Sequence, residues 1–534
     1  MKVRNDILKM SKNLHTWVGI CSGILLFICF FSAALSMFQH DLSRWAAPPQ
    51  QKLPSITYEQ YPELIAKVHA QYPESRNDFL LSVASPEEFY APMSWRPQGD
   101  SVFRGAFSFD NVSMLASLDQ HGDLIVQKEN LSRAGFLLEQ LHETAGLPNI
   151  IEDHHNNGVT VMGVVAALYF LAIMSGLIVL LPTLVKDYFA IRNGKNQKRF
   201  WLDMHNVAGI TSLPFHIIIC VTVVSFAFHD EFFEGLEMLA KHDKTIEQKM
   251  MAGGNTMIPN PQFDAKTLLN RVSDAVGQDH IRTVRFTSLD KPQKSRIFIG
   301  FQQDDGLKRG DHTDFIFAQT YQQRPYDSLY KANESSKASA FIKSMFSLHF
   351  GNYGGDFVRW VYFVLGLVGA FLFYSGNMLW INSRLKKVKK VLLPYKEQKL
   401  SVRILENLTV GTCFGCMLGI FCGFFMVRWL YVVLPEVHSV NKILGYGYYV
   451  IFLGSVAYCF ALRAEKARRH LMIACALVLL GIPLTSLLSM LMPDLALWHN
   501  SGRLLWVDVM ALVSAGVFYL FYRTNQRRMA LQPS

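Results

Sequence analysis

The chain is poor in charge for its length. Asp, Glu, Lys and Arg make up 18% of its 534 residues, where a soluble protein carries about 25%. With an apolar fraction of 50% the chain is not intrinsically disordered, and its 35 glycines are far too few for collagen. The apolar residues gather in blocks of about twenty, long enough to cross a hydrocarbon core about 30 Å thick. The composition therefore predicts an α-helical membrane protein with several spans.

Cysteine is missing from the two longest polar segments of the chain. All eight cysteines lie in or beside apolar runs, at positions 21, 29, 220, 413, 416, 422, 459 and 475. The polar segments therefore hold no disulfide framework, and a small disulfide-stapled secreted fold is excluded. Cys413 and Cys416 have the spacing of a redox pair, but their place inside an apolar run favours packing residues over a dithiol or a metal site.

Windows of about nineteen residues predict eight spans. They lie near 17–38, 161–182, 207–229, 358–380, 406–432, 442–462, 470–492 and 504–522. Lys and Arg concentrate at the N-terminus, after the second, fourth and sixth spans, and after the eighth. The positive-inside rule then places both termini in the cytoplasm, so the net charge of +10 reflects topology and requires no nucleic-acid partner. The first span begins like a signal peptide, but its apolar run is too long for one, and we expect it to be retained.

The predicted fold class is an α-helical polytopic membrane protein of about eight transmembrane helices with two small α+β domains on the exported side. Helices are predicted at 61–70 and 265–276, and strands at 123–126, 283–286 and 296–300. The predicted order is span 1–40, exported domain 41–157, span 158–182, cytoplasmic loop 183–206, span 207–229, exported domain 230–357, span 358–380, cytoplasmic loop 381–405 and a four-span extension over 406–534. In that extension we expect no strong chemical motif.

Matching motifs indicate an internal duplication, because the order of span, exported segment and span occurs twice. His15 and His205 each begin a His-x-x-x-Gly motif, and a hydroxyl residue follows each histidine after seventeen positions. Leu-His precedes the second and fourth spans, at His142 and His349. Both of these spans end in Ser-Gly, at Ser175-Gly176 and Ser375-Gly376.

A twofold axis between the repeats would bring His15 near His205 on the cytoplasmic side and His142 near His349 on the exported side. Imidazole suits iron, and two histidines fill both axial positions of a haem, which leaves an electron carrier without an open site. The glycine four residues on lies on the same helix face and would make room for a flat porphyrin. A single histidine at a membrane boundary is usually an interfacial polar residue, but four at repeat-equivalent positions favour ligands.

His216 complicates this pairing. It follows His205 by eleven residues, about 16.5 Å along a straight helix and within about 20° of the same face. His216 either replaces one member of the exported pair or packs beside a haem. His154 and His155 lie near the exported boundary, where contact with the surface or with a haem propionate is expected rather than ligation.

With these motifs the chain resembles the PepSY-associated transmembrane helix family, iron-regulated proteins of the bacterial inner membrane. The resemblance covers about residues 10–385. It rests on Leu14-His15-Thr16-Trp17-Val18-Gly19, on Trp201-Leu202-Asp203-Met204-His205-Asn206 running to Leu213-Pro214-Phe215-His216, and on Leu348-His349-Phe350-Gly351-Asn352-Tyr353-Gly354-Gly355 with Ser375-Gly376-Asn377-Met378-Leu379-Trp380. The stretch from Pro148 to Gly158 departs from the pattern and bears on the role of His142.

The resemblance implies PepSY-like exported domains and the activity of a ferric-siderophore reductase carrying b-type haem between membrane helices. The expected function is an electron conduit of two haems, with His15, His205, His142 and His349 as iron ligands, which reduces a ferric siderophore or another ferric chelate in the periplasm. No dinucleotide-binding glycine motif or flavin domain is present, so the electron donor is a separate protein, a soluble cofactor or membrane quinol.

Two other functions remain open from the sequence. PepSY domains could instead form a non-enzymatic binding or sensing module of the cell envelope. The chain could also be a membrane transporter component, although its first four spans lack a mid-membrane acidic residue that would serve as a proton relay.

Overall fold

The structure, a computed structural model, divides the chain into two compact units. It describes residues 3–83, 91–97, 113–130, 132–147, 157–182, 197–227, 258, 261–302, 314–321, 337–351, 353–388, 391–434 and 437–530. The helical unit comprises Met1–Pro49, Leu131–Ala227 and Arg359–Ser534, and the sheet unit comprises Gln50–Asn130 and Phe228–Val358.

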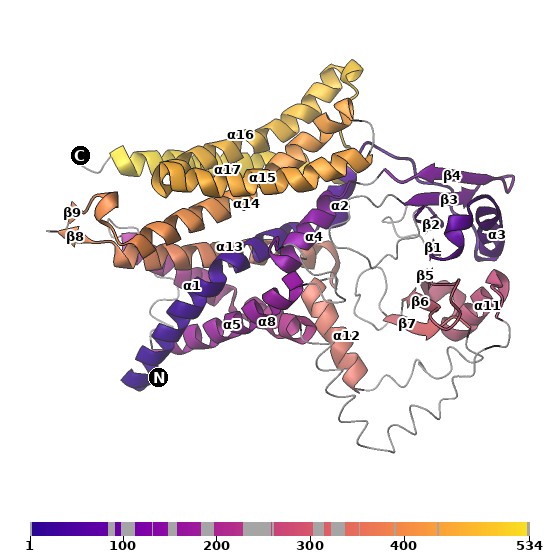
Figure 1. Cartoon of the computed structure of the whole chain (residues 1–534), viewed down its shortest axis with the longest axis horizontal. Coiled ribbons are helices and arrows are strands. Elements are labelled where there is room, and N and C mark those ends of the chain that lie inside the picture. The colour runs from indigo at the N-terminus through magenta and orange to yellow at the C-terminus, as the bar shows by residue number, and fades with distance from the viewer. Residues whose placement is uncertain are drawn as a thin grey trace. The chain divides into compact units, whose positions relative to one another are not determined.

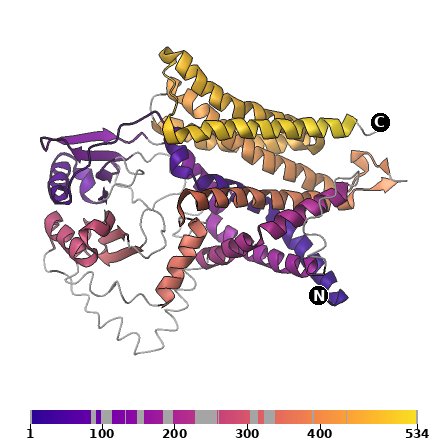
Figure 2. The ribbon, with the colours of Figure 1, turned by 180° about the vertical axis from the view of Figure 1, so that it is seen from behind.

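Long apolar helices make up the helical unit (Figures 1 and 2). They are α1 (Asn5–Ser36), α5 (Asn157–Leu180), α7 (Gln197–Thr211), α8 (Leu213–Ala227), α13 (Gly355–Arg384), α14 (Leu400–Val433), α15 (Val437–Leu462), α16 (Ala464–Leu491) and α17 (Leu505–Ala530). In the described part of the chain, seven helices are long and apolar enough to cross a membrane, and α7 with α8 makes an eighth if the bent pair is one span. The predicted spans are therefore found. A helix satisfies its own backbone polar groups, which is what a bilayer requires.

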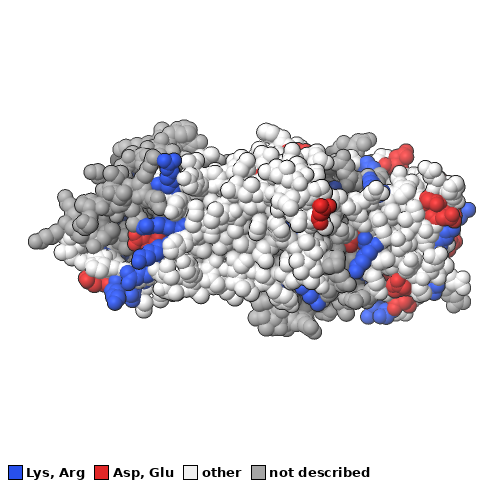
Figure 3. All heavy atoms as spheres, turned by 90° about the horizontal axis from the view of Figure 1, so that it is seen from above, with Lys and Arg blue, Asp and Glu red and all other residues white. Residues whose placement is uncertain are grey.

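Charge is distributed as a membrane unit requires. On the face drawn in Figure 3, charged side chains are sparse along the middle of the helical unit, and Lys and Arg gather toward one end. That end carries the short strands β8 (Lys387–Val388) and β9 (Val391–Leu392), which lie in the predicted basic loop 381–405. Two short helices, α2 (Gln39–Trp45) and α4 (Ala134–Thr144), pack against one another, and α4 also packs on α1.

The third predicted span is broken. The helix bends by 67° between Thr211 and Leu213. Pro214 has no N–H to donate to the carbonyl of Ile210, and its ring clashes with that carbonyl, so a regular helix cannot continue here. The prediction that His205 and His216 share one face of a straight helix is therefore wrong, because the bend lies between them.

The sheet unit is built on one seven-stranded antiparallel sheet in the order β4-β3-β2-β1-β5-β6-β7. The strands are β1 (Phe79–Ser82), β2 (Met93–Trp95), β3 (Met114–Leu118), β4 (Leu124–Lys128), β5 (Ile281–Thr287), β6 (Arg296–Phe301) and β7 (Asp314–Gln319). Two helices, α3 (Tyr61–Gln71) and α11 (Ala265–Val276), contribute apolar side chains to its core. Asp264 caps α11 by accepting hydrogen bonds from the backbone N–H groups of Lys266 and Thr267. A third helix of this unit, α12 (Lys337–Phe350), carries His349.

The two polar segments share this sheet. The predicted helices and strands are all found, but the prediction of two separate domains differs from the structure, because β1 pairs with β5. Phe79 lies opposite Phe286 in that register, and their rings stack with centroids 4.9 Å apart. Each of these strands is the first after its segment's helix, so their antiparallel pairing is what a twofold axis between repeats produces. The pairing also covers two strand edges that would otherwise be open.

The shared sheet generates the first prediction, on topology. Its two halves must lie on the same side of a membrane, so α5 and the bent α7–α8 pair should each cross once. Reporter fusions after residues 195, 390 and 466 should report cytoplasm, and fusions after 100 and 300 should report periplasm. Opposite signals from 100 and 300, or a periplasmic signal at 390, would contradict this arrangement.

Candidate functional site

His15 on α1 and His205 on α7 lie next to each other inside the helical unit. Their ring centroids are 6.0 Å apart and the ring planes are inclined by 67°. The repeat predicted this proximity, and it is found although the residues are 190 positions apart in the chain.

Each of the two rings is hydrogen-bonded to a carbonyl oxygen of a neighbouring helix. His15 Nδ1 lies 2.8 Å from the oxygen of Ala172 on α5, and His205 Nδ1 lies 3.2 Å from the oxygen of Leu372 on α13. A carbonyl can only accept, so the bond to Ala172 requires the proton of His15 on Nδ1, which leaves Nε2 its lone pair. His205 Nδ1 also lies 3.2 Å from the Ser375 hydroxyl, which itself donates to the Leu372 carbonyl, and the same tautomer satisfies these contacts. Metal-binding imidazoles use this arrangement, in which a bond at one nitrogen fixes the ring and leaves the other nitrogen for the metal.

The glycines of the two Ser-Gly motifs allow the rings to come this close. A Cβ at Gly176 would lie 2.8 Å from His15 Cε1, and one at Gly376 would lie 3.2 Å from His205 Cε1. The glycine of the first His-x-x-x-Gly motif borders open space, since a Cβ at Gly19 would meet nothing within 4 Å. At Gly209 a Cβ would meet only the Leu372 side chain, at 3.4 Å. Gly19 and Gly209 therefore leave the helix surface beside the histidines bare, so a flat group could lie against it.

The duplication extends to individual hydrogen bonds. The Ser22 hydroxyl donates to the Val18 carbonyl at 2.8 Å, and the Ser212 hydroxyl donates to the Ala208 carbonyl at 2.6 Å. Both residues of the second bond lie 190 positions after their counterparts in the first, the offset that also separates His15 from His205. The same offset relates the Ser32–Ile28 bond to the Thr222–Ile218 bond.

His216 on α8 occupies a second, deeply buried position. Its side chain is 2% exposed, and its Nδ1 is hydrogen-bonded to the hydroxyl of Tyr169 on α5. Its Nε2 is buried and has no hydrogen-bond partner among the residues that the structure describes. The rings of Phe30 and Phe215 lie against it. A Cβ at Gly369 on α13 would lie 3.0 Å from His216 Cε1. This imidazole therefore also has an occupied Nδ1 and a remaining Nε2.

The remaining predicted ligands, His142 and His349, belong to different units of the structure. His142 on α4 has its Nδ1 3.3 Å from the carbonyl oxygen of Cys29. Cys29 contacts His142, and the next residue of α1, Phe30, contacts His216. The two histidines therefore lie at the same height along α1. His349 packs against Phe350 in the sheet unit, so its pairing with His142 stays a prediction. His154 and His155 lie outside the described residues.

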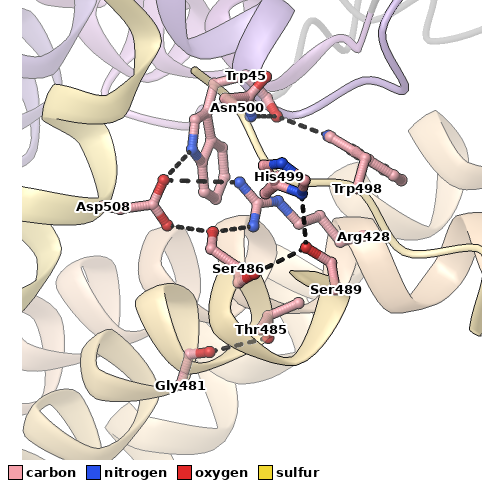
Figure 4. Close-up of polar contacts among 10 residues, drawn as sticks. All are labelled: Trp45, Arg428, Gly481, Thr485, Ser486, Ser489, Trp498, His499, Asn500 and Asp508. Carbon is pink, nitrogen blue, oxygen red and sulfur yellow. Dashed lines mark hydrogen bonds and ion pairs between the residues drawn. The ribbon is translucent and has the colours of Figure 1, made fainter. Parts of the chain in front are cut away.

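A polar cluster in the extension was missed from the sequence (Figure 4). Arg428 on α14 and Asp508 on α17 are 1% and 4% exposed, and Arg428 Nη2 lies 3.8 Å from Asp508 Oδ2. Ser486 bridges them, accepting from Arg428 Nη1 at 2.5 Å and donating to Asp508 Oδ1 at 2.6 Å. The expectation of no strong motif here was therefore wrong. Two ionisable residues inside apolar windows were a signal that could have been used.

This cluster fastens α2 to the extension. Trp45 Nε1 donates to Asp508 at 3.1 Å, and the Arg428 guanidinium lies 4.1 Å from the centroid of the Trp45 ring. The Trp45 carbonyl accepts from Trp498 Nε1 at 3.3 Å and from Asn500 Nδ2 at 3.1 Å. Burying charge is costly unless it is paired, so Arg428 and Asp508 depend on each other.

We therefore predict a stability effect that depends on the pairing. Arg428→Met should lower the free energy of unfolding by about 3–5 kcal/mol, because it leaves the Asp508 carboxylate buried without its cation. Arg428→Met combined with Asp508→Leu should recover most of that loss. Thermal unfolding of the purified protein in detergent measures both. If Arg428→Met alone were as stable as the wild type, the ion pair would contribute nothing to the free energy of unfolding.

No group of three or more His, Cys, Asp or Glu side chains suited to a metal ion occurs in the described ranges. The chain is thus a helical membrane protein in which two half-buried histidines lie side by side, and the two repeats share one sheet. The family model of the PepSY-associated TM region matches residues 12–383, and the chain belongs to that family. A search of curated proteins finds no significant match. The matched region contains every candidate histidine and ends before α14.

Proposed function

We propose that this protein is a haem-b electron conduit of the bacterial inner membrane that reduces a ferric siderophore, or another ferric chelate, in the periplasm for iron uptake. The observation that carries the proposal is the His15–His205 pair. In both imidazoles Nδ1 is hydrogen-bonded to a carbonyl oxygen, which leaves Nε2 to bind a metal. Neutral imidazole with a free Nε2 is the form that binds iron.

The residues present fit a haem held by two histidines. With centroids 6.0 Å apart, both imidazoles would be close enough to hold one metal ion, since a metal–nitrogen bond is about 2.0–2.1 Å and begins at the ring edge. Gly176 lets the His15 ring pack on α5, and Gly376 lets the His205 ring pack on α13. Gly19 leaves open space on α1, one turn after His15. Haem b bound here would supply one-electron chemistry at an iron with no open position.

For the second haem, the structure favours His216 with His142. The repeat alone suggested His142 with His349, but His216 carries the buried Nε2 without a partner and lies at the level of His142 on α1. On α13, His216 packs at Gly369 and His205 packs at Gly376, seven residues or about 10.5 Å along the helix. Two histidine layers so close together are suited to passing electrons along the bundle axis.

The sheet unit is the part proposed to meet the ferric chelate, as a PepSY-type module on the periplasmic side. A chelate too polar to enter the bilayer has to be reduced at that face. The electron donor is then a separate protein, a soluble cofactor or membrane quinol, because no nucleotide-binding motif is found in the sequence.

A second candidate function, that of a transporter component, is favoured by the Arg428–Asp508 pair. Ionisable residues buried among membrane helices commonly mark an ion or substrate path. The two functions predict different optical spectra, because only the conduit requires haem.

The haem proposal is tested by spectra of the purified protein and its variants. The wild type should show a Soret band and contain two haems b per chain by the pyridine haemochrome assay. His15→Ala and His205→Ala should each lose the same single haem, because the two side chains share one iron. A colourless wild-type protein would refute the proposal in favour of a binding module or transporter, and two variants that lose different haems would refute the pairing.

A glycine variant sharpens this test without touching a ligand. Gly176→Val should also remove the His15–His205 haem, because its Cβ would lie 2.8 Å from the imidazole. Gly516→Val on α17 is the matched control, since a Cβ there meets nothing within 4 Å, and it should keep both haems.

A further inference from the structure

Tyr169 sits at the point where His216 is held. The tyrosine is 4% exposed, and its ring meets the His216 ring edge-on, with centroids 5.9 Å apart and planes at 90°. Phe30 and Phe373 pack on Tyr169 with centroid distances of 5.7 and 5.5 Å. The hydrogen bond between the phenol and His216 Nδ1 is therefore surrounded by aromatic rings.

The position of the ring proton decides what this hydrogen bond does. If the proton were on Nε2, the Tyr169 O–H would donate to Nδ1, but the Nε2 proton would be a buried donor with no acceptor in the described part of the chain, which is an unfavourable state. If the proton is on Nδ1, the phenol oxygen of Tyr169 accepts it, the phenol O–H gives up the ring as its acceptor, and Nε2 presents a lone pair. Each tautomer thus leaves one buried donor outside this hydrogen bond, and a metal at Nε2 selects the second. Only the second tautomer can bind a metal, and metal binding then gives the buried Nε2 its missing partner.

The duplication shows that this arrangement occurs once. The pairs Ala172–Leu372 and Gly176–Gly376 relate α5 to α13 by 200 positions, so the counterpart of Tyr169 is Gly369. The offset of 190 makes Leu26 the counterpart of His216. The first repeat thus provides the phenol of Tyr169. The second provides Gly369, which has no side chain and so leaves room for the imidazole. Where His15 and His205 use carbonyls of α5 and α13, His216 uses the phenol of α5.

We infer that Tyr169 is the positioning residue of the second haem site, where its phenol oxygen accepts the Nδ1 proton of His216 and so presents Nε2 to iron. This inference rests on the proposed function and deepens it. An acceptor at Nδ1 makes the imidazole a stronger electron donor at Nε2, and loss of such an acceptor typically weakens metal binding about 10- to 100-fold.

Tyr169→Phe in the full-length protein tests this directly, because it removes one oxygen and keeps the ring packing. The second haem should bind about 10- to 100-fold more weakly in a titration of the haem-depleted protein. Its reduction potential should rise, because the weaker ligand stabilises ferric iron less, while the His15–His205 haem should be unchanged. Tyr374→Phe is the matched control, since Tyr374 packs against Trp201 and Phe414 on the same bundle, and it should leave both haems unaltered.

The outcomes separate this inference from the proposed function. A wild-type protein without haem would refute both. If the wild type holds two haems and Tyr169→Phe keeps the affinity, potential and electron paramagnetic resonance signals of both, the role of Tyr169 is wrong and the conduit stands. If His216→Ala keeps both haems with wild-type spectra, His216 is no ligand and the inference is overturned in the same way.

Discussion

The hydrogen bond from an imidazole Nδ1 to a group on a neighbouring helix is the interaction on which the candidate site depends. Between apolar helices the acceptor for that proton comes from a neighbouring helix, and α5 and α13 provide it. The carbonyl of Ala172 accepts from His15 Nδ1 in addition to the hydrogen bond of its own helix, and Ser175 Oγ lies 3.2 Å from the same oxygen. Gly176 makes this possible, because any side chain there would displace the ring. Histidine, carbonyl and glycine thus act as one unit, repeated at His205.

The duplication organises both units of the molecule. In the helical unit it repeats serine and threonine bonds at an offset of 190, and in the sheet unit it pairs β1 with β5 at the centre of one sheet. The departures from it fall where chemistry is proposed. The second repeat alone is bent before Pro214, and it alone carries His216. A duplicated scaffold with one asymmetric buried imidazole gives two unlike histidine positions along one bundle.

Much of this organisation could be predicted from the sequence. Apolar blocks marked the spans, because length and composition decide what can cross a bilayer. The proximity of His15 and His205 followed from the duplication. Pro214 was visible too, but a straight span was assumed, and the relation of His216 to His205 was wrong as a result. The shared sheet could not be predicted, because no local pattern shows that the first strand of one segment pairs with that of another.

The polar partners of the buried residues were also beyond reach from the sequence. Tyr169 stands in an apolar run with nothing to distinguish it from a packing residue, and only the crossing of α5 and α8 brings it to His216. Arg428 and Asp508 are 80 positions apart, so their place inside apolar windows marks each one but does not show that they pair. Contacts of this kind depend on helix rotation and tilt, which packing sets.

The central claim, that electrons cross the bundle from one face to the other, is tested most directly in sealed vesicles. The haem-loaded protein is reconstituted with the sheet unit inward, a ferric chelate and a ferrous-specific dye are trapped in the lumen, and an impermeant reductant is added outside. The account predicts that the ferrous–dye complex forms in the lumen with wild-type protein and is abolished by His15→Ala. Formation at the wild-type rate in that variant, with its haem lost, would contradict the account.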